Sequence, residues 1–202
     1  MLNFDIELSL KKPVIGIDEV GRGPLAGPVV SCACIFLDYL IDQSKLFFFD
    51  DSKKLTSKKR EEAFQIVHQL KNDNKLKYAL GLATVNEIDS LNILEATKIS
   101  MKRAVQKLQY DKANLIIDGK IDLELPEFPS IGIVNGDQLS FSIATASIIA
   151  KASTEISAWT ARINLPLLGD SDLQSELTEK IQALVTSCDS LARSIDEACR
   201  AV

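Results

Sequence analysis

The sequence predicts an α/β fold in which helices flank a mixed β-sheet, with an atypical helical tail at the C-terminus. Three features of the chain support this prediction. Two short apolar segments near the N-terminus are strand-like and follow each other, further strand-like segments then alternate with helical ones, and the last part of the chain carries a heptad pattern. Strands in a run, followed by alternating strands and helices, are typical of a mixed sheet covered by helices.

The first two strands are expected at residues 14–17 and 29–37. Both segments are apolar, and the stretch at 21–28 between them is rich in glycine and proline, as a loop would be. Asp18 and Glu19 therefore fall where the first strand meets this loop.

The middle of the chain predicts a strand between two helical segments. Residues 57–70 carry apolar side chains at helical spacing, and 75–85 is the third strand candidate. The segment 87–108 is helical, and a joint is expected near Asn92.

Two more strands and a helix follow. The apolar strand at 113–117 ends on Asp118, and the strand at 131–134 leads into a turn that contains Asp137. Residues 142–152 are mostly small, which favours a helix that packs closely against its neighbours.

The tail differs in kind, so we divide the chain into a domain at 1–153 and a helical tail at 154–202. A coiled-coil seam and a long amphipathic helix that lies on its own domain both explain the apolar spacing of the tail, and the first would allow a protein contact. The apolar positions are separated by alternating steps of four and three: Leu177, Ile181, Leu184, Cys188, Leu191, Ile195, Ala198 and Val202.

The composition excludes several classes of protein. The 202 residues are 46% hydrophobic and 25% charged, which is the ordinary globular range. The net charge of -5 argues against a strongly basic nucleic-acid binder, so such a contact must come from a local patch. The N-terminus lacks a basic leader segment and no apolar stretch approaches the about 18 residues of a spanning helix, so we expect no membrane contact and a cytoplasmic location.

The residue types also limit the chemistry. His68 is the single histidine and the chain has no Cys-x-x-Cys pair, which leaves no parts for a zinc site or for a histidine-based nucleophile. The remaining candidates for catalysis are metal ions that bind through oxygen ligands.

Four acids share one setting at strand ends and glycine turns: Asp18, Glu19, Asp118 and Asp137. Strand ends converge on one edge of a sheet. Crowded carboxylates repel one another, and a divalent cation can neutralise them. Oxygen ligands favour Mg²⁺ or Mn²⁺, and two such ions about 4 Å apart would activate a water and stabilise the leaving oxygen of a phosphodiester. Taken singly, an aspartate before glycine also fits a plain turn residue.

The same region carries groups suited to phosphates. Gly21 and Gly23 let the backbone approach a ligand closely, and Arg22 between them supplies a planar fork of donors. Lys53 is a second basic candidate, although a solvated helix entrance explains it equally well.

A long sequence string links these residues to a known family. Residues 17–29 read I-D-E-V-G-R-G-P-L-A-G-P-V, and this string resembles ribonuclease HII. The blocks D-S-K-K-L at 51–55, I-D-G at 117–119 and A-S-I-I-A-K at 146–151 stand in the order of that family. The resemblance covers about residues 13–151.

The resemblance implies a ribonuclease H-like fold and an endonuclease that acts with Mg²⁺ or Mn²⁺. Its substrates would be the RNA strand of RNA–DNA hybrids and ribonucleotides embedded in duplex DNA, and its products would carry 5′-phosphate and 3′-hydroxyl ends. Asp18, Glu19, Asp118 and Asp137 match the metal-binding acids of the family.

The resemblance also assigns substrate contacts. Gly21, Arg22 and Gly23 match the loop that grips the ribonucleotide, whose 2′-hydroxyl distinguishes RNA from DNA. Lys53 matches a basic position near the substrate backbone. Lysines that neutralise phosphates make binding fall steeply with salt.

After Lys151 the pattern of the family ends. A tyrosine that stacks under the ribonucleotide sugar is expected downstream, whereas the tyrosines of this chain are Tyr39, Tyr78 and Tyr110. Two alternatives therefore stay open: a catalytically impaired nucleic-acid or protein interaction module with a nuclease-like core, and a related nuclease such as ribonuclease HIII or an integrase-like enzyme. The tail itself fits a divergent C-terminus, a frameshift or fusion, or an added partner-binding helix.

Overall fold

The computed structural model describes residues 2–23, 27–41 and 57–163. The chain divides into two compact units, Met1–Thr154 and Glu155–Val202. Most of the second unit, including the heptad pattern, lies outside the described residues, so the helical tail and its protein contact stay predictions. Among the described helices, none is both long enough and apolar enough to cross a membrane.

Five strands form one sheet in the order β3-β2-β1-β4-β5. The strand β1 runs antiparallel to β2 and parallel to β4, β2 is antiparallel to β3, and β4 is parallel to β5. The mixed sheet is therefore as predicted. Its strands are β1 (Val14–Val20), β2 (Val29–Phe36), β3 (Leu76–Ala83), β4 (Asn114–Asp118) and β5 (Ser130–Ile133).

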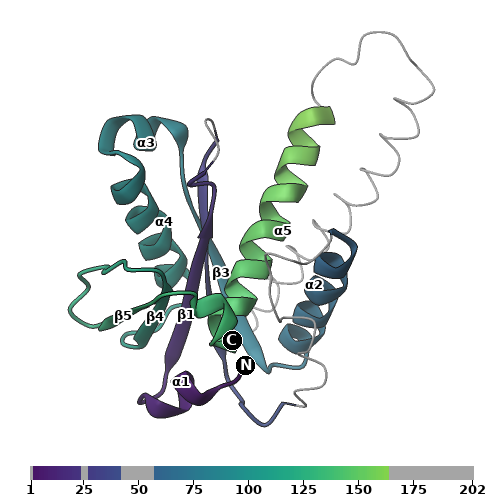
Figure 1. Cartoon of the computed structure of the whole chain (residues 1–202), viewed down its shortest axis with the longest axis vertical. Coiled ribbons are helices and arrows are strands. Elements are labelled where there is room, and N and C mark those ends of the chain that lie inside the picture. Colours follow the sequence, from purple (N-terminus) through teal and green to yellow (C-terminus); the bar gives the residue numbers. More distant parts are fainter. Residues whose placement is uncertain (1, 24–26, 42–56, 164–202) are drawn as a thin grey trace. The chain divides into compact units, whose positions relative to one another are not determined.

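Helices cover both faces of this sheet. Figure 1 shows α3 and α4 on one side and α2 with the first part of α5 on the other. The helices are α1 (Asp5–Ser9), α2 (Ser57–Asn72), α3 (Val85–Leu91), α4 (Ile93–Lys107) and α5 (Phe141–Ile163), with the short 3-10 helix η2 (Gly136–Gln138) before α5.

The alternation of side chains along β1 creates two cores. Ile15 and Ile17 are fully buried with Met101 of α4 on one face, while even-numbered positions face α5. Gly16 allows α5 to come close, because a Cβ at this position would overlap the backbone of Ser142 and lie 2.6 Å from the backbone nitrogen of Ile143. The start of α5 is thus seated directly on β1.

The predicted elements are confirmed with shifted ends. The strand β1 continues through Asp18 and Glu19 to Val20, so the acidic pair lies within the strand and not in the loop after it. The joint at Asn92 is present: its φ is 77°, and its side chain accepts hydrogen bonds from the first two backbone amides of α4 beyond Ile93. The short helix α1 was not predicted.

Candidate functional site

Asp18 and Asp118 lie side by side on two neighbouring strands, Asp118 as the last residue of β4 and Asp18 two residues before the end of β1. The parallel register pairs Ile17 of β1 with Ile117 of β4, so the next residues along the two strands are the two aspartates. Both occupy even-numbered positions, whose side chains point toward α5. The convergence of acids that was predicted from strand ends is confirmed for this pair.

Asp18 is a buried carboxyl in acidic surroundings. Its side chain accepts a hydrogen bond from the backbone N–H of Glu19 at 2.8 Å and one from the hydroxyl of Ser147. The residue is 6% exposed. Burial, and then the nearby carboxylates of Glu19 and Asp118, raise the pKa of Asp18 to about 7. Such a group is close to half ionised at neutral pH, and a nearby positive charge would favour its ionised form.

Glu19 follows in the strand and is held by Arg22. The Arg22 guanidinium donates to Oε1 of Glu19 at 3.0 Å, and the Glu19 side chain is 13% exposed. Burial raises the pKa of Glu19, while Arg22 opposes this rise and Asp118 adds to it. The second oxygen, Oε2, is buried and has no hydrogen-bond partner within the described part of the chain.

Asp137 is brought to the same region by the turn before α5. Asn135 adopts a left-handed backbone with φ of 56°, and η2 begins at the next residue. The backbone N–H of Gly136 donates to Oδ1 of Asp118 at 2.8 Å, which links the turn to the end of β4. Asp137 is 1% exposed. Asp137 therefore directly follows the residue whose backbone contacts Asp118.

The structure therefore brings the predicted acids together in part. Asp18, Glu19 and Asp118 influence one another electrostatically, and Asp137 is joined to them through the backbone of its neighbour. In residues 2–23, 27–41 and 57–163, however, no three histidine, cysteine, aspartate or glutamate side chains are arranged so that they could hold a metal ion. In this arrangement Glu19 is engaged in the ion pair with Arg22.

The glycine loop after β1 is only partly described. Gly21 has a φ of 101°, and a Cβ there would overlap the carbonyl oxygen of Pro28, so both conformation and space require glycine. Around Gly23 a Cβ would meet no atom within 4 Å among the described residues. Lys53, the predicted basic contact, lies outside the described residues.

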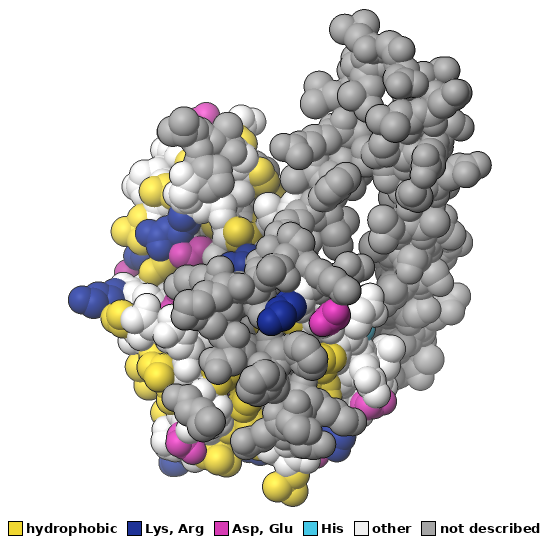
Figure 2. All heavy atoms as spheres, turned by 45° about the vertical axis from the view of Figure 1, so that its right-hand side comes forward, with side chains coloured by type: hydrophobic (Ala, Val, Ile, Leu, Met, Phe, Trp, Pro, Cys, Tyr) yellow, Lys and Arg dark blue, Asp and Glu magenta, His cyan; other side chains and the backbone are white. Residues whose placement is uncertain are grey.

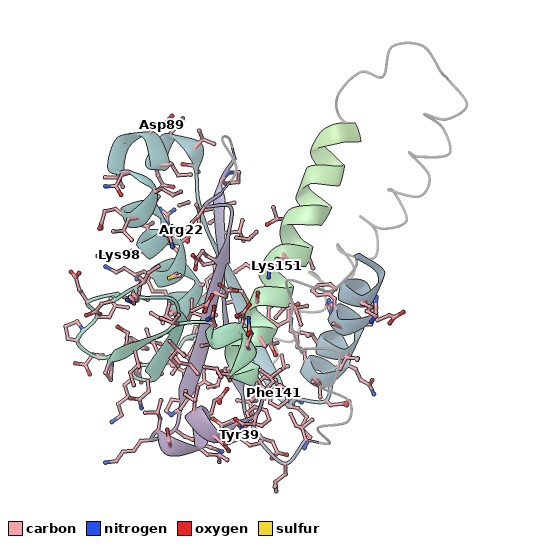
Figure 3. All side chains as sticks on the ribbon, in the orientation of Figure 1. Arg22, Tyr39, Asp89, Lys98, Phe141 and Lys151 are labelled. Carbon is pink, nitrogen blue, oxygen red and sulfur yellow. The ribbon has the colours of Figure 1, made fainter. Side chains whose placement is uncertain are left out.

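Two residues of α5 have a role that the sequence interpretation did not assign. The Lys151 ammonium donates to Oγ of Ser147 at 2.8 Å, and the Ser147 side chain is hydrogen-bonded to Asp18. Figure 3 shows Lys151 on α5, further along the helix than Phe141. The spacing of four between Ser147 and Lys151 was the available signal, but only the seating of α5 on β1 connects it to Asp18.

Positive and negative side chains are mixed on the one face of the molecule that Figure 2 draws. On the face drawn in Figure 2, lysine and arginine side chains are interspersed with aspartate and glutamate. This agrees with the net charge of -5, and it makes a local group such as Arg22 more important for any phosphate contact than the overall field.

The comparisons with known sequences agree on one family. A family model described as Ribonuclease HII matches residues 15–165, which extends past the expected end at Lys151. A ribonuclease HII of Desulfitobacterium hafniense is 51% identical over 144 residues, which is 70% of this chain and 51% of that protein. A ribonuclease HII of Wolbachia pipientis is 44% identical over 153 residues, covering 76% of this chain and 73% of the relative. The chain thus spans about half the length of the first relative and about three quarters of the second.

Solved structures support the fold. The ribonuclease H2 of Pyrococcus horikoshii OT3 superposes with a TM-score of 0.62 at 25% identity, covering 80% of this chain and 82% of that one. A ribonuclease HIII in complex with Mn²⁺, Bst-RNase HIII, gives a TM-score of 0.55 at 19% identity over 83% of this chain and 61% of that one. The ribonuclease H-like fold expected from the resemblance is confirmed.

Proposed function

Because the chain belongs to the ribonuclease HII family, we propose that it is a divalent-cation-dependent endonuclease that cuts the RNA strand of RNA–DNA hybrids and ribonucleotides embedded in duplex DNA. The observation that carries this proposal is the pair Asp18 and Asp118 on adjacent parallel strands. Burial and neighbouring acids destabilise the ionised form of Asp18, and such an arrangement is retained where function needs it.

The donor set fits a hard divalent cation. The candidate ligands Asp18, Glu19, Asp118 and Asp137 offer only carboxylate oxygens, which suit Mg²⁺ or Mn²⁺. Oε2 of Glu19 is a buried acceptor without a hydrogen bond in the described residues. When bound, such cations activate a water and stabilise the leaving oxygen of a phosphodiester. The Mn²⁺ complex of the structurally similar ribonuclease HIII is consistent with this choice.

Assembly of the complete site requires Arg22 to change its partner. In the free protein its guanidinium forms an ion pair with Glu19, while 41% of the Arg22 side chain is exposed. A substrate phosphate presents the same planar pair of acceptor oxygens to the guanidinium as a carboxylate does. We therefore expect Arg22 to turn from Glu19 to a phosphate when a duplex binds, which leaves the Glu19 carboxylate available to a cation.

The rest of the substrate contact comes from the loop after β1. Gly21 gives the loop its turn, and the backbone at Gly23 can approach a bound nucleic-acid strand closely, because no side chain intervenes. A donor at this point would detect the 2′-hydroxyl of a ribonucleotide. Lys53 is proposed as a second phosphate contact on the resemblance alone.

The other residues near Asp18 orient it. Ser147 donates to Asp18 and accepts from Lys151, so α5 holds the carboxylate through a chain of two hydrogen bonds. This arrangement fixes the direction of the Asp18 oxygens before a ligand arrives, which is the usual role of groups behind metal ligands. Cleavage on the 5′ side of the ribonucleotide would leave a 3′-hydroxyl and a 5′-phosphate.

A duplex that contains one ribonucleotide, and a full RNA–DNA hybrid, test the proposal. Each is incubated with the protein in Mg²⁺, in Mn²⁺ and in EDTA, with an all-DNA duplex as control and Asp18→Asn as the matched variant. Cleavage that needs the cation, the ribonucleotide and Asp18 supports the proposal. Equal cleavage by wild type and variant would refute it.

One outcome would favour an interaction module instead. The chain has no tyrosine after Tyr110, so the stacking group expected under the ribonucleotide sugar has no counterpart. Tight binding of the hybrid in EDTA, with no product in either cation, would identify a protein that keeps the nuclease core and has lost turnover.

A further inference from the structure

A further acid, which is not one of the four candidate ligands, is enclosed at the start of α5. Glu7 lies in α1 and is 0% exposed, whereas its helix neighbour Leu8 is 63% exposed. A buried carboxylate destabilises a fold by several kcal/mol unless polar groups compensate it. None of the ion pairs found in the described residues includes Glu7.

Part of the compensation comes from the N-terminus of α5 and reaches one carboxylate oxygen only, because Oε2 of Glu7 is buried and has no hydrogen-bond partner within the described residues. Oε1 of Glu7 accepts a hydrogen bond from the hydroxyl of Ser140 at 2.7 Å and one from the backbone N–H of Ser142 at 2.9 Å. The Ser140 hydroxyl in turn accepts from the backbone N–H of Ile143 at 3.2 Å. Glu7 and Ser140 together therefore satisfy two of the amides that every helix leaves unpaired in its first turn, and the negative charge of Glu7 suits the positive end of the helix dipole.

Several further contacts tie the same N-terminal segment to this junction. The backbone of Asn3 bridges to Ser140 and accepts from the N–H of Phe141 at 3.3 Å. The ring of Phe4 packs against Phe141 at 4.8 Å and against Tyr39 at 4.9 Å between centroids. Figure 3 shows Tyr39 and Phe141 at the end of the molecule where α1 lies. Asn3, Phe4 and Glu7 together therefore hold the start of α5 in place, and we call these three residues the N-terminal clamp.

The junction held by this clamp carries parts of the proposed site on both sides. On one side, the N–H of Ser140 donates to the carbonyl of Gly136 at 2.9 Å, and Gly136 donates to Asp118 and precedes Asp137. On the other side, Ser147 stands seven residues after Ser140, about 10 Å along the helix axis at about 1.5 Å per residue. Glu7 is thus too far from Asp18 to contact a cation bound there. It nevertheless holds the start of the helix that carries Ser147.

We infer that Glu7 is a positioning residue: it locks the junction of η2 and α5, and thereby sets Asp137 and Ser147 in place for the cation-binding acids. This inference rests on the proposed function. A tightly held helix start is needed because Ser147 must meet Asp18 by a hydrogen bond, whose strength falls steeply with distance and angle.

Three variants separate this role from general stability. Glu7→Ala removes both acceptor bonds, Glu7→Gln keeps an acceptor oxygen at the same reach, and Ser140→Ala removes only the hydroxyl that links Glu7 to the first turn. Val105→Ala is the control, since Val105 is 1% exposed in the core on the opposite face of the sheet. Circular dichroism and urea unfolding establish that each variant is folded.

The measurements are the dissociation constant for Mn²⁺ alone, by calorimetry, and the rate on a hybrid at saturating Mn²⁺. Loss of an interaction behind a metal ligand typically weakens metal affinity by about tenfold or more. We expect a weakening of this size for Glu7→Ala, a smaller one for Ser140→Ala, values close to wild type for Glu7→Gln, and no change in Val105→Ala at comparable loss of stability.

Wild-type Mn²⁺ affinity and rate in folded Glu7→Ala would overturn the inference. If Glu7→Ala does not fold, unchanged Mn²⁺ affinity in Ser140→Ala would overturn it instead, and an equal loss in Val105→Ala would show that stability alone explains the effect. Failure of the proposed function has a different signature, because the wild-type protein itself would then neither bind Mn²⁺ nor cleave the hybrid, which would overturn both.

Discussion

Replacement of Asp18 by asparagine should make the metal-free protein more stable at neutral and alkaline pH. Asparagine has the size and shape of aspartate and keeps an oxygen that can accept from the Glu19 amide, as Asp18 does at 2.8 Å. It removes a charge that is 6% exposed and lies beside two other acids. The wild-type carboxylate therefore opposes folding, and the amide does not.

The size of the effect follows from the pKa of Asp18. Burial and the nearby acids raise it from the ordinary value of 3.8 to about 7. Below about pH 3 the carboxyl is mostly protonated in both the folded and the unfolded chain, and it costs almost nothing. As the pH rises toward 7, the unfolded chain ionises first, so the free energy of unfolding falls. At about 1.4 kcal/mol for each tenfold change in ionisation, the full loss is about 4 kcal/mol and is complete above about pH 7.

Urea unfolding in EDTA measures this loss. A series from about pH 5.5 to about pH 8.5 stays on one side of the sequence pI of about 5.0, and about half of the total loss develops within it. We expect the advantage of Asp18→Asn to grow across the series. Asp38→Asn, which removes the same charge, is the control. The Lys75 ammonium lowers the pKa of Asp38, so this replacement brings no gain in the free energy of unfolding at high pH. An advantage of Asp18→Asn that is absent, or that does not change with pH, would refute the reasoning.

Four further substitutions test the site and its support. Asp118→Asn should leave the fold intact and remove cleavage of a hybrid, which gel analysis of the products measures; wild-type cleavage would exclude Asp118 as a ligand. Arg22→Ala should weaken hybrid binding in EDTA and reduce the slope of log affinity against log salt by about 1; an unchanged slope would remove Arg22 from the phosphate contacts. Gly16→Ala and Gly81→Ala each force a Cβ into helix backbone, Gly16 against α5 and Gly81 against α4, and should each lose about 1–3 kcal/mol in unfolding experiments. Cleavage by the folded protein should fall further for Gly16→Ala, and equal rates for the two would contradict a special role of the α5 seating.

The fold was largely predictable because its elements are marked by local signals. The strand that ends on Asp118 has an apolar centre, Leu115 to Ile117, and Asn92 both ends one helix and caps the next. Helix α1 was missed because it has only five residues and owes its place to contacts with residues more than a hundred positions away, such as that of Glu7 with Ser140. No local pattern reports a contact of that range.

The site was predictable to the level of residue types but not of partners. Asp18 and Asp118 could be placed together because strands end at a common edge. Arg22 and Glu19 were assigned separately to a phosphate and to a metal, and the structure pairs them with each other. In the absence of a ligand, the two charges compensate one another, which a sequence interpretation based on the bound state does not foresee.

Two buried acids contact α5, Glu7 from α1 and Asp18 from β1, and they show how structure separates support from chemistry. Glu7 receives a hydroxyl and a backbone amide at the start of α5, and these two bonds hold the helix in place. Asp18 receives a backbone amide and the Ser147 hydroxyl, but its burial, and then Glu19 and Asp118, disfavour its charged form. A carboxylate whose hydrogen bonds hold a helix start is a structural anchor, whereas one that burial and neighbouring acids destabilise gains most from an added cation. On this argument, Glu7 anchors the start of α5, and Ser147 of the same helix can then hold Asp18 in place. The charged form of Asp18 is one that the protein alone does not stabilise.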